Sequence, residues 1–164
     1  MASQSSPMPA QAAHVAAGND RDARVLNLVR IFDAPRQAVF DAWTDPKQII
    51  QWWGPQGVSV AEHAFDMRPG GRWRTNKRGA EGVDHIASGV YHEIAPPERL
   101  VMSWAWETDG VRGHETLLTI ELDDLGDDRC QLRLTQELFE SAEACHGHEE
   151  GWCSAFECLT EYLA

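Results

Sequence analysis

The sequence lacks the features that accompany binding to nucleic acids or membranes. It carries 26 acidic residues against 14 lysines and arginines, a formal net charge of -12, and it contains no basic stripe. An acidic surface repels phosphate backbones and anionic lipid headgroups. The continuous apolar stretches are also far shorter than the roughly 20 residues that a membrane helix requires. We therefore expect neither nucleic acid nor a membrane as a partner.

Signals for export and for disulfide formation are missing as well. The first twenty residues, MASQSSPMPAQAAHVAAGND, contain neither the basic segment nor the apolar segment of a secretory signal. The cysteines form no C-x-x-C pair; they are Cys130, Cys145, Cys153 and Cys158. A cytoplasmic protein with free thiols is the expectation.

Motifs for cofactors and metals are absent too. There is no phosphate-binding loop, no dinucleotide fingerprint and no nucleophile elbow. Cys145, His146, His148, Glu149 and Cys153 lie close together in the sequence, but their spacing matches no zinc pattern. On a helix, His148 and Glu149 would also point in different directions. We expect no metal and no cofactor.

What the sequence does contain is a long run of strand patterns. Apolar and polar residues alternate over 24–32, and again in about six segments between 58 and 138, which is typical of half-buried strands. The segment 123–128 is expected to be a loop centred on Gly126. Residues 1–22, rich in Ala, Ser, Gln and Pro, are expected to form a flexible tail. Residues 23–164 have the size of a single domain.

Helices are predicted on both sides of the strand region. Two short helices are expected between Pro35 and Trp52, the first of them capped by Asp33. A long C-terminal helix should begin at Ser141, a good N-cap. Its apolar stripe steps by three or four residues and consists of Cys145, His148, Trp152, Phe156, Leu159 and Leu163.

This order of elements predicts an α+β fold. Consecutive strands joined by short turns favour a meander, and the long helix supplies an apolar stripe that matches the buried face of such a sheet. We expect a curved antiparallel sheet of about six or seven strands wrapped around the C-terminal helix, with the two short helices at one end.

Several short segments carry a resemblance to a known family. They are RIFDAP (30–35), VFDAWTDP (39–46), WWGP (52–55), DMRPGG (66–71) followed by Trp73, GVYHEI (89–94), PERL (97–100) and HEEGW (148–152). In this order the sequence resembles the SRPBCC, or START-like, superfamily with its helix-grip fold. Within it, the chain is similar to the bacterial branch related to the C-terminal domain of the heat-shock protein 90 ATPase activator. The resemblance implies a hydrophobic cavity between sheet and long helix, but proteins of this fold carry lipids, bind hormones, cyclise polyketides or assist chaperones.

The candidate ligand-binding residues come from an unusual number of tryptophans, seven in the chain. They could form an ordinary aromatic core or the wall of a cavity. On the second interpretation the candidates are Trp43, Trp53, Trp73, Trp104, Trp106, His148, Trp152 and Phe156. Gly147 and Gly151 lie inside the long helix, where each costs about 1 kcal/mol relative to alanine. Close approach of the helix to the sheet, or a bend, would explain them.

His148 is the candidate catalytic residue. It could act as an acid or base in the cavity together with a carboxylate such as Glu93 or Glu137, or it could be a buried histidine bonded to a sheet carbonyl. Three functions follow as hypotheses. The first is binding of a small apolar molecule, the second is an enzyme of the cyclase, dehydratase or hydrolase type, and the third is a chaperone-linked interaction module. The protein could also form a homodimer, since the sequence does not determine its oligomeric state.

Overall fold

The computed structural model describes residues 22–164. The predicted tail, residues 1–22, lies outside the described residues except for Asp22, which begins the short 3-10 turn η1 (Asp22–Arg24). The remaining elements are, in chain order, β1 (Leu26–Phe32), α2 (Arg36–Thr44), α3 (Pro46–Ile49), β2 (Ser59–Phe65), β3 (Arg72–Arg78), β4 (Asp84–Ala95), β5 (Arg99–Thr108), β6 (Val111–Arg112), β7 (Thr116–Gly126), β8 (Arg129–Glu137) and α4 (Ala142–Leu163).

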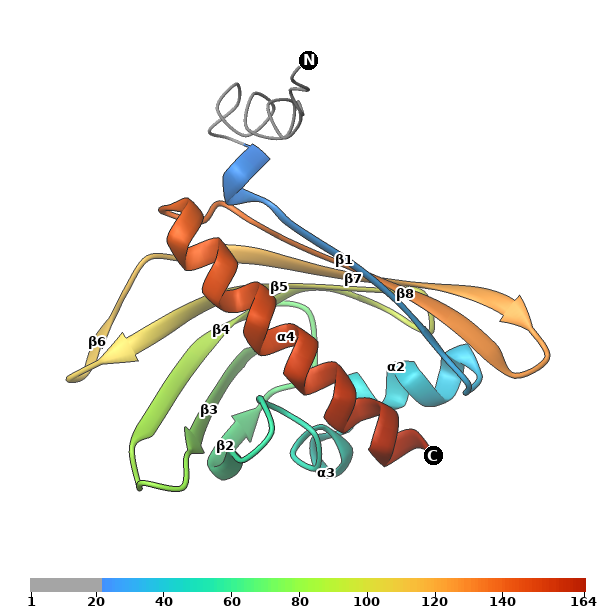
Figure 1. The fold of residues 1–164 in the computed structure, drawn as a ribbon, viewed down its shortest axis with the longest axis horizontal. Helices are drawn as coiled ribbons and strands as arrows, with labels where there is room; N and C mark the ends of the chain where they lie inside the picture. Colours follow the sequence, from blue (N-terminus) through green and yellow to red (C-terminus); the bar gives the residue numbers. More distant parts are fainter. Residues whose placement is uncertain (1–21) are drawn as a thin grey trace, which may run out of the picture.

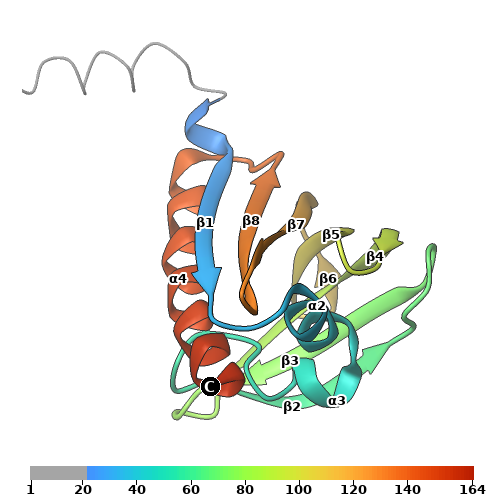
Figure 2. The ribbon, with the colours of Figure 1, turned by 90° about the vertical axis from the view of Figure 1, so that its right-hand side faces the viewer.

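The described strands form one antiparallel sheet of eight strands. Their order is β1-β8-β7-β5-β4-β3-β2, and β6 pairs with β5 outside this path. The predicted α+β helix-grip architecture is confirmed: the sheet curves around one side of α4 (Figures 1 and 2). The prediction of six or seven strands does not include β6, a strand of two residues that pairs with the end of β5.

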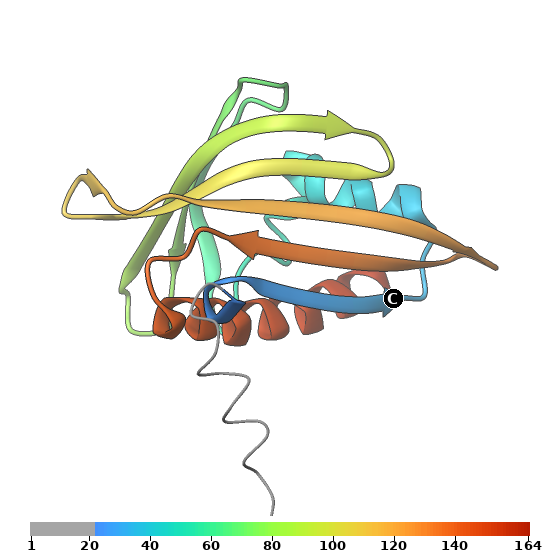
Figure 3. The same ribbon diagram turned by 90° about the horizontal axis from the view of Figure 1, so that it is seen from above.

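The long helix is packed differently at its two ends. In the view of Figure 3, α4 lies along the lower edge of the sheet, and its C-terminal end is on the same side as α2. There the Tyr162 hydroxyl donates to Gln48 Oε1 at 3.2 Å. The short helices therefore close the sheet at the C-terminal end of α4, and the N-terminal half of the helix faces the sheet without them.

The predicted loop over 123–128 is wrong. Strand β7 continues to Gly126, and its ladder with β8 reaches the pair formed by Gly126 and Arg129. The turn is confined to Asp127 and Asp128, whose φ angles are 53° and 57°. Aspartate tolerates this left-handed region better than most residues, so a two-residue hairpin turn replaces the expected loop.

One predicted helix cap is wrong and the other is confirmed. The residue before α2 is Pro35, and no side chain caps that helix. Asp33 instead forms an ion pair with Arg129 at 3.2 Å. At α4, the Ser141 Oγ accepts a hydrogen bond from the Ala144 backbone N–H at 3.0 Å.

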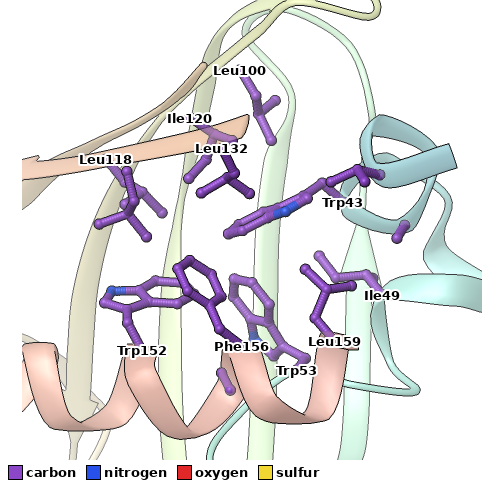
Figure 4. Close-up of a cluster of buried hydrophobic side chains, with 14 of the residues drawn as sticks. Trp43, Ile49, Trp53, Leu100, Leu118, Ile120, Leu132, Trp152, Phe156 and Leu159 are labelled. Carbon is purple, nitrogen blue, oxygen red and sulfur yellow. The ribbon is translucent and has the colours of Figure 1, made fainter. Parts of the chain in front are cut away.

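The core lies between α4 and the concave face of the sheet (Figure 4). Trp152, Phe156 and Leu159 rise from the helix toward Leu118, Ile120 and Leu132 on the strands, and Trp43 enters from α2. The helix residues are 5 %, 1 % and 0 % exposed, respectively. The predicted inward direction of the α4 stripe is therefore confirmed for these side chains.

A glycine lets one tryptophan lie close to the sheet. Trp73 donates its indole N–H to the Ser103 carbonyl oxygen at 3.2 Å. A Cβ atom at Gly89 would lie 1.9 Å from that oxygen and 2.6 Å from Trp73 Nε1. Only glycine leaves room for this arrangement, because a side chain would overlap both groups.

Candidate ligand-binding pocket

A pocket of about 420 Å³ lies between the N-terminal half of α4 and the sheet. Its walls come from α4, from β3, β5 and β7, and from the segments that precede β2 and α4. The lining residues are Trp53, Gly54, Pro55, Lys77, Trp104, Trp106, His114, Thr116, Phe139, Glu140, Ala144, Gly147, His148, Gly151, Trp152 and Ala155. A concave, largely aromatic surface with few polar groups is the usual form of a small-molecule site.

Four of the predicted tryptophans line this pocket. The ring centroids of Trp53, Trp104 and Trp152 lie 5.5 to 5.6 Å from one another. Trp106 packs edge-on against Trp104 at 5.6 Å and is 40 % exposed. Three indoles thus form a mutually packed wall, and the fourth lies at the rim.

The other three predicted aromatic residues do not line the pocket. Trp43, Trp73 and Phe156 are only 1 to 2 % exposed. Trp43 packs against Trp152 at 5.7 Å between centroids, and Phe156 packs against the same ring at 6.0 Å. They belong to the core behind the wall.

A buried chain of hydrogen bonds holds two of the wall tryptophans. The Trp152 indole donates to Gln136 Oε1 at 2.8 Å, and Gln136 Nε2 donates to Thr116 Oγ1 at 2.9 Å. The Thr116 hydroxyl in turn donates to the Trp104 carbonyl oxygen at 3.1 Å. These bonds fix the Trp152 ring and the backbone of Trp104, whereas the buried indole N–H of Trp104 has no hydrogen-bond partner among the described residues.

The two glycines of α4 leave space rather than allowing close contact. Gly147 and Gly151 are one helical turn apart and both line the pocket. A Cβ atom built on either would meet nothing within 4 Å. The expected close approach of helix and sheet is therefore wrong at these positions, and the absent side chains enlarge the pocket instead.

His148 enters the pocket but has an indole, not a carboxylate, as its partner. Its Nε2 accepts a hydrogen bond from the Trp106 indole N–H at 3.0 Å, so the ring proton is on Nδ1. Burial and, to a lesser degree, the charge of Lys77 lower the pKa of His148 to about 4. The imidazole is therefore neutral at physiological pH.

The expected carboxylate partners of His148 lie elsewhere. Glu93 forms an ion pair with Arg99 at 2.7 Å. Among the described residues, neither Glu93 nor Glu137 hydrogen-bonds to His148. The expected bond from His148 to a sheet carbonyl is also absent among the described residues, where the hydrogen-bond partner of His148 is the Trp106 indole.

Lys77 is a buried charged residue of the pocket that the sequence analysis missed. It is 5 % exposed, and its Nζ lies 5.5, 5.1 and 5.2 Å from the ring centroids of Trp53, Trp104 and Trp106. Burial lowers its pKa to about 8. The alternation of β3 places residue 77 on the same face as Trp73, and this signal could have identified it.

Comparison with known proteins identifies the family. The chain matches the family described as "Activator of Hsp90 ATPase homolog 1-like protein" over residues 33–164. The chain belongs to this family. The assignment agrees with the resemblance read from the sequence motifs, and it covers α2 to α4 with all pocket-lining residues.

Solved structures share both the sequence pattern and the fold of this family member. The AHSA1 protein of Silicibacter pomeroyi is 29% identical with a TM-score of 0.78; the match covers 85% of this chain and 96% of that one. A protein of Chromobacterium violaceum is 27% identical, with a TM-score of 0.76 and the same coverages. A protein of Arthrobacter aurescens is 26% identical, with a TM-score of 0.76 and 88% coverage of both chains. A search of curated proteins gives no match.

Two further properties bear on partners. In the part of the chain that the structure describes, no helix is long and apolar enough to cross a membrane. Over residues 22–164, no three His, Cys, Asp or Glu side chains gather in a way that could hold a metal ion.

Proposed function

We propose that this AHSA1-like protein binds a small, mostly apolar molecule in the pocket between α4 and the sheet. The observation that carries the proposal is the unfilled space of about 420 Å³ beside three packed indole rings. Burial of an apolar ligand against these rings would contribute about 25 cal/mol for each Å² removed from water.

The sequence also supports a space that is kept open. Gly147 and Gly151 cost the helix about 1 kcal/mol each relative to alanine. Alanine would fit at both positions, because nothing lies within 4 Å of the added Cβ. Glycine at these two positions therefore favours an open pocket at the expense of helix stability.

The location proposed for the protein is the cytoplasm. All four cysteines, Cys130, Cys145, Cys153 and Cys158, are free thiols. Free thiols of this kind are usual in a reducing compartment.

The test is a titration with N-phenyl-1-naphthylamine, a neutral apolar fluorophore whose emission rises in an apolar site. We expect saturable binding at one site, with quenching of tryptophan fluorescence. Gly151→Leu should abolish both signals because its side chain would extend into the pocket. Cys153→Leu is the matched control: it adds a similar apolar side chain at an exposed position of the same helix.

Two results would refute the proposal. One is the absence of saturable fluorophore binding to the wild-type protein. The other is unchanged binding to Gly151→Leu, which would place the fluorophore outside the pocket. Helical content measured by circular dichroism shows whether both variants are folded.

A further inference from the structure

The pocket contains a buried cation without an anion. Lys77 is 5 % exposed, and no hydrogen bond or ion pair holds its Nζ in the described part of the chain. Its contacts are the faces of three indole rings at 5.1 to 5.5 Å. Aromatic faces attract an ammonium group but carry no charge that could neutralise it, and buried charges are normally paired.

The backbone holds Lys77 in this position. The segment after α3 crosses the lysine side chain at Gly54, whose φ is +105°. A Cβ at Gly54 would lie 2.8 Å from the Lys77 Cδ atom. Glycine thus lets the backbone cover the aliphatic part of the lysine, and the ammonium end remains at the pocket wall.

No other group in the pocket supplies the missing charge. The titratable residues that share the lining are His114, Glu140 and His148. His148 is neutral, since its pKa lies at about 4. Glu140 is exposed and forms no ion pair with Lys77. Outside the pocket, the other lysine of the chain, Lys47, is exposed to solvent.

From this arrangement we infer that the ligand is an aromatic carboxylic acid whose carboxylate pairs with Lys77 and whose ring lies against the indole wall. The inference rests on the proposed function and adds the chemical class of the ligand. A single ammonium group matches a single negative charge, whereas a phosphate would bring a second charge that no described pocket residue balances. The indole faces suit a flat ring, which can stack against them.

The experiment compares 2-naphthoate with 2-naphthamide, two probes of nearly the same shape that differ in charge. Each probe displaces N-phenyl-1-naphthylamine from the wild-type protein, from Lys77→Met and from Lys47→Met. Methionine keeps the length and apolar volume of lysine, and Lys47→Met controls for the change in net charge. We expect 2-naphthoate to bind the wild type and Lys47→Met at least tenfold more tightly than 2-naphthamide. In Lys77→Met this preference should disappear through loss of 2-naphthoate affinity, with less than threefold change for 2-naphthamide.

Different failures have different meanings. If the fluorophore does not bind the wild type, the proposed function fails and the inference fails with it. If the fluorophore binds but 2-naphthoate displaces it no better than 2-naphthamide, or keeps its preference in Lys77→Met, only the inference is overturned.

A second measurement needs no variant. The carboxylate pairs only with the protonated lysine, so the wild-type affinity for 2-naphthoate should fall at least tenfold between pH 7 and pH 10. The affinity for 2-naphthamide should stay constant over the same range. Parallel pH profiles for the two probes would overturn the inference even if Lys77→Met did not fold.

Discussion

Replacing Lys77 with methionine is expected to stabilise the folded protein at neutral pH. Burial lowers the pKa of Lys77 from 10.5 to about 8, a displacement equivalent to about 3 kcal/mol of unfavourable free energy for the charged form. The side chain is only 5 % exposed, so solvent screens little of this cost. Loss of the cation–π contacts offsets about 1–2 kcal/mol. We therefore expect Lys77→Met to be about 1–2 kcal/mol more stable than the wild type at pH 7.

The pH dependence of this difference is the sharper test. Between pH 8 and pH 10.5 the folded protein has released the lysine proton and the unfolded chain still holds it. Because the unfolded state binds more protons, the contribution of Lys77 makes the wild type more stable as pH rises through this window. The advantage of Lys77→Met should therefore be largest below pH 8 and shrink toward pH 10.5.

Urea unfolding, followed by tryptophan fluorescence from pH 7 to pH 10, measures the difference. Other groups titrate there too: burial raises the pKa of Cys130 to about 11, which lowers stability at high pH. That effect is common to both proteins and cancels in their difference. Lys47→Met should show no such pH-dependent gain. A Lys77→Met protein that is less stable than the wild type at pH 7, or a difference that does not change with pH, would refute the reasoning.

Three further outcomes are expected. Gly147→Ala and Gly151→Ala should each stabilise the protein by about 1 kcal/mol and raise the Tm by roughly 2–4 °C; a lower Tm in a thermal scan would contradict the open space found at both Cβ positions. The unfolded chain protonates His148 near pH 6.5 and the folded protein only near pH 4, so stability should fall by up to about 3 kcal/mol across that window as pH decreases. His148→Gln keeps an acceptor for the Trp106 indole and should lack this component; equal slopes in urea melts of the two proteins would exclude it. Ser141→Ala should cost about 1 kcal/mol through loss of the N-cap bond to the first turn of α4, and an unchanged urea midpoint would show that the cap contributes nothing.

Most of the fold could be predicted because two periodicities are local properties of the chain. Alternation places the strands, and a step of three or four residues places Trp152 and Phe156 on one face of a long helix. The β7–β8 connection was missed for a physical reason. Asp127 and Asp128 read as polar loop residues, but their left-handed backbone closes a hairpin in two residues, so the strands run on beside them.

The candidate site was harder to predict, because alternation gives the face of a residue and not its depth. Trp104 and Trp106 lie two residues apart on β5, yet one is 3 % exposed and the other 40 %. Which tryptophans border the empty space depends on the position of α2 and α3, which close the sheet only at the C-terminal end of α4. Lys77 follows Trp73 with the period of a strand, but a lysine is almost never fully buried without a partner. Its role depends on three rings that come from two other segments, Trp53 before β2 and the pair Trp104 and Trp106 on β5.

The pocket departs from the choices that would maximise stability in two independent ways. Gly147 and Gly151 together cost about 2 kcal/mol of helix stability, and the buried charge of Lys77 costs about 3 kcal/mol before its indole contacts are counted. Small domains are stable by only about 5–15 kcal/mol in total, so these are large fractions. A ligand at one hundred times its Kd would return about 2.7 kcal/mol to the folded state. An apolar body would fill the space beside the glycines, and an anionic group would neutralise the lysine, so one molecule of the proposed kind offsets both costs at once.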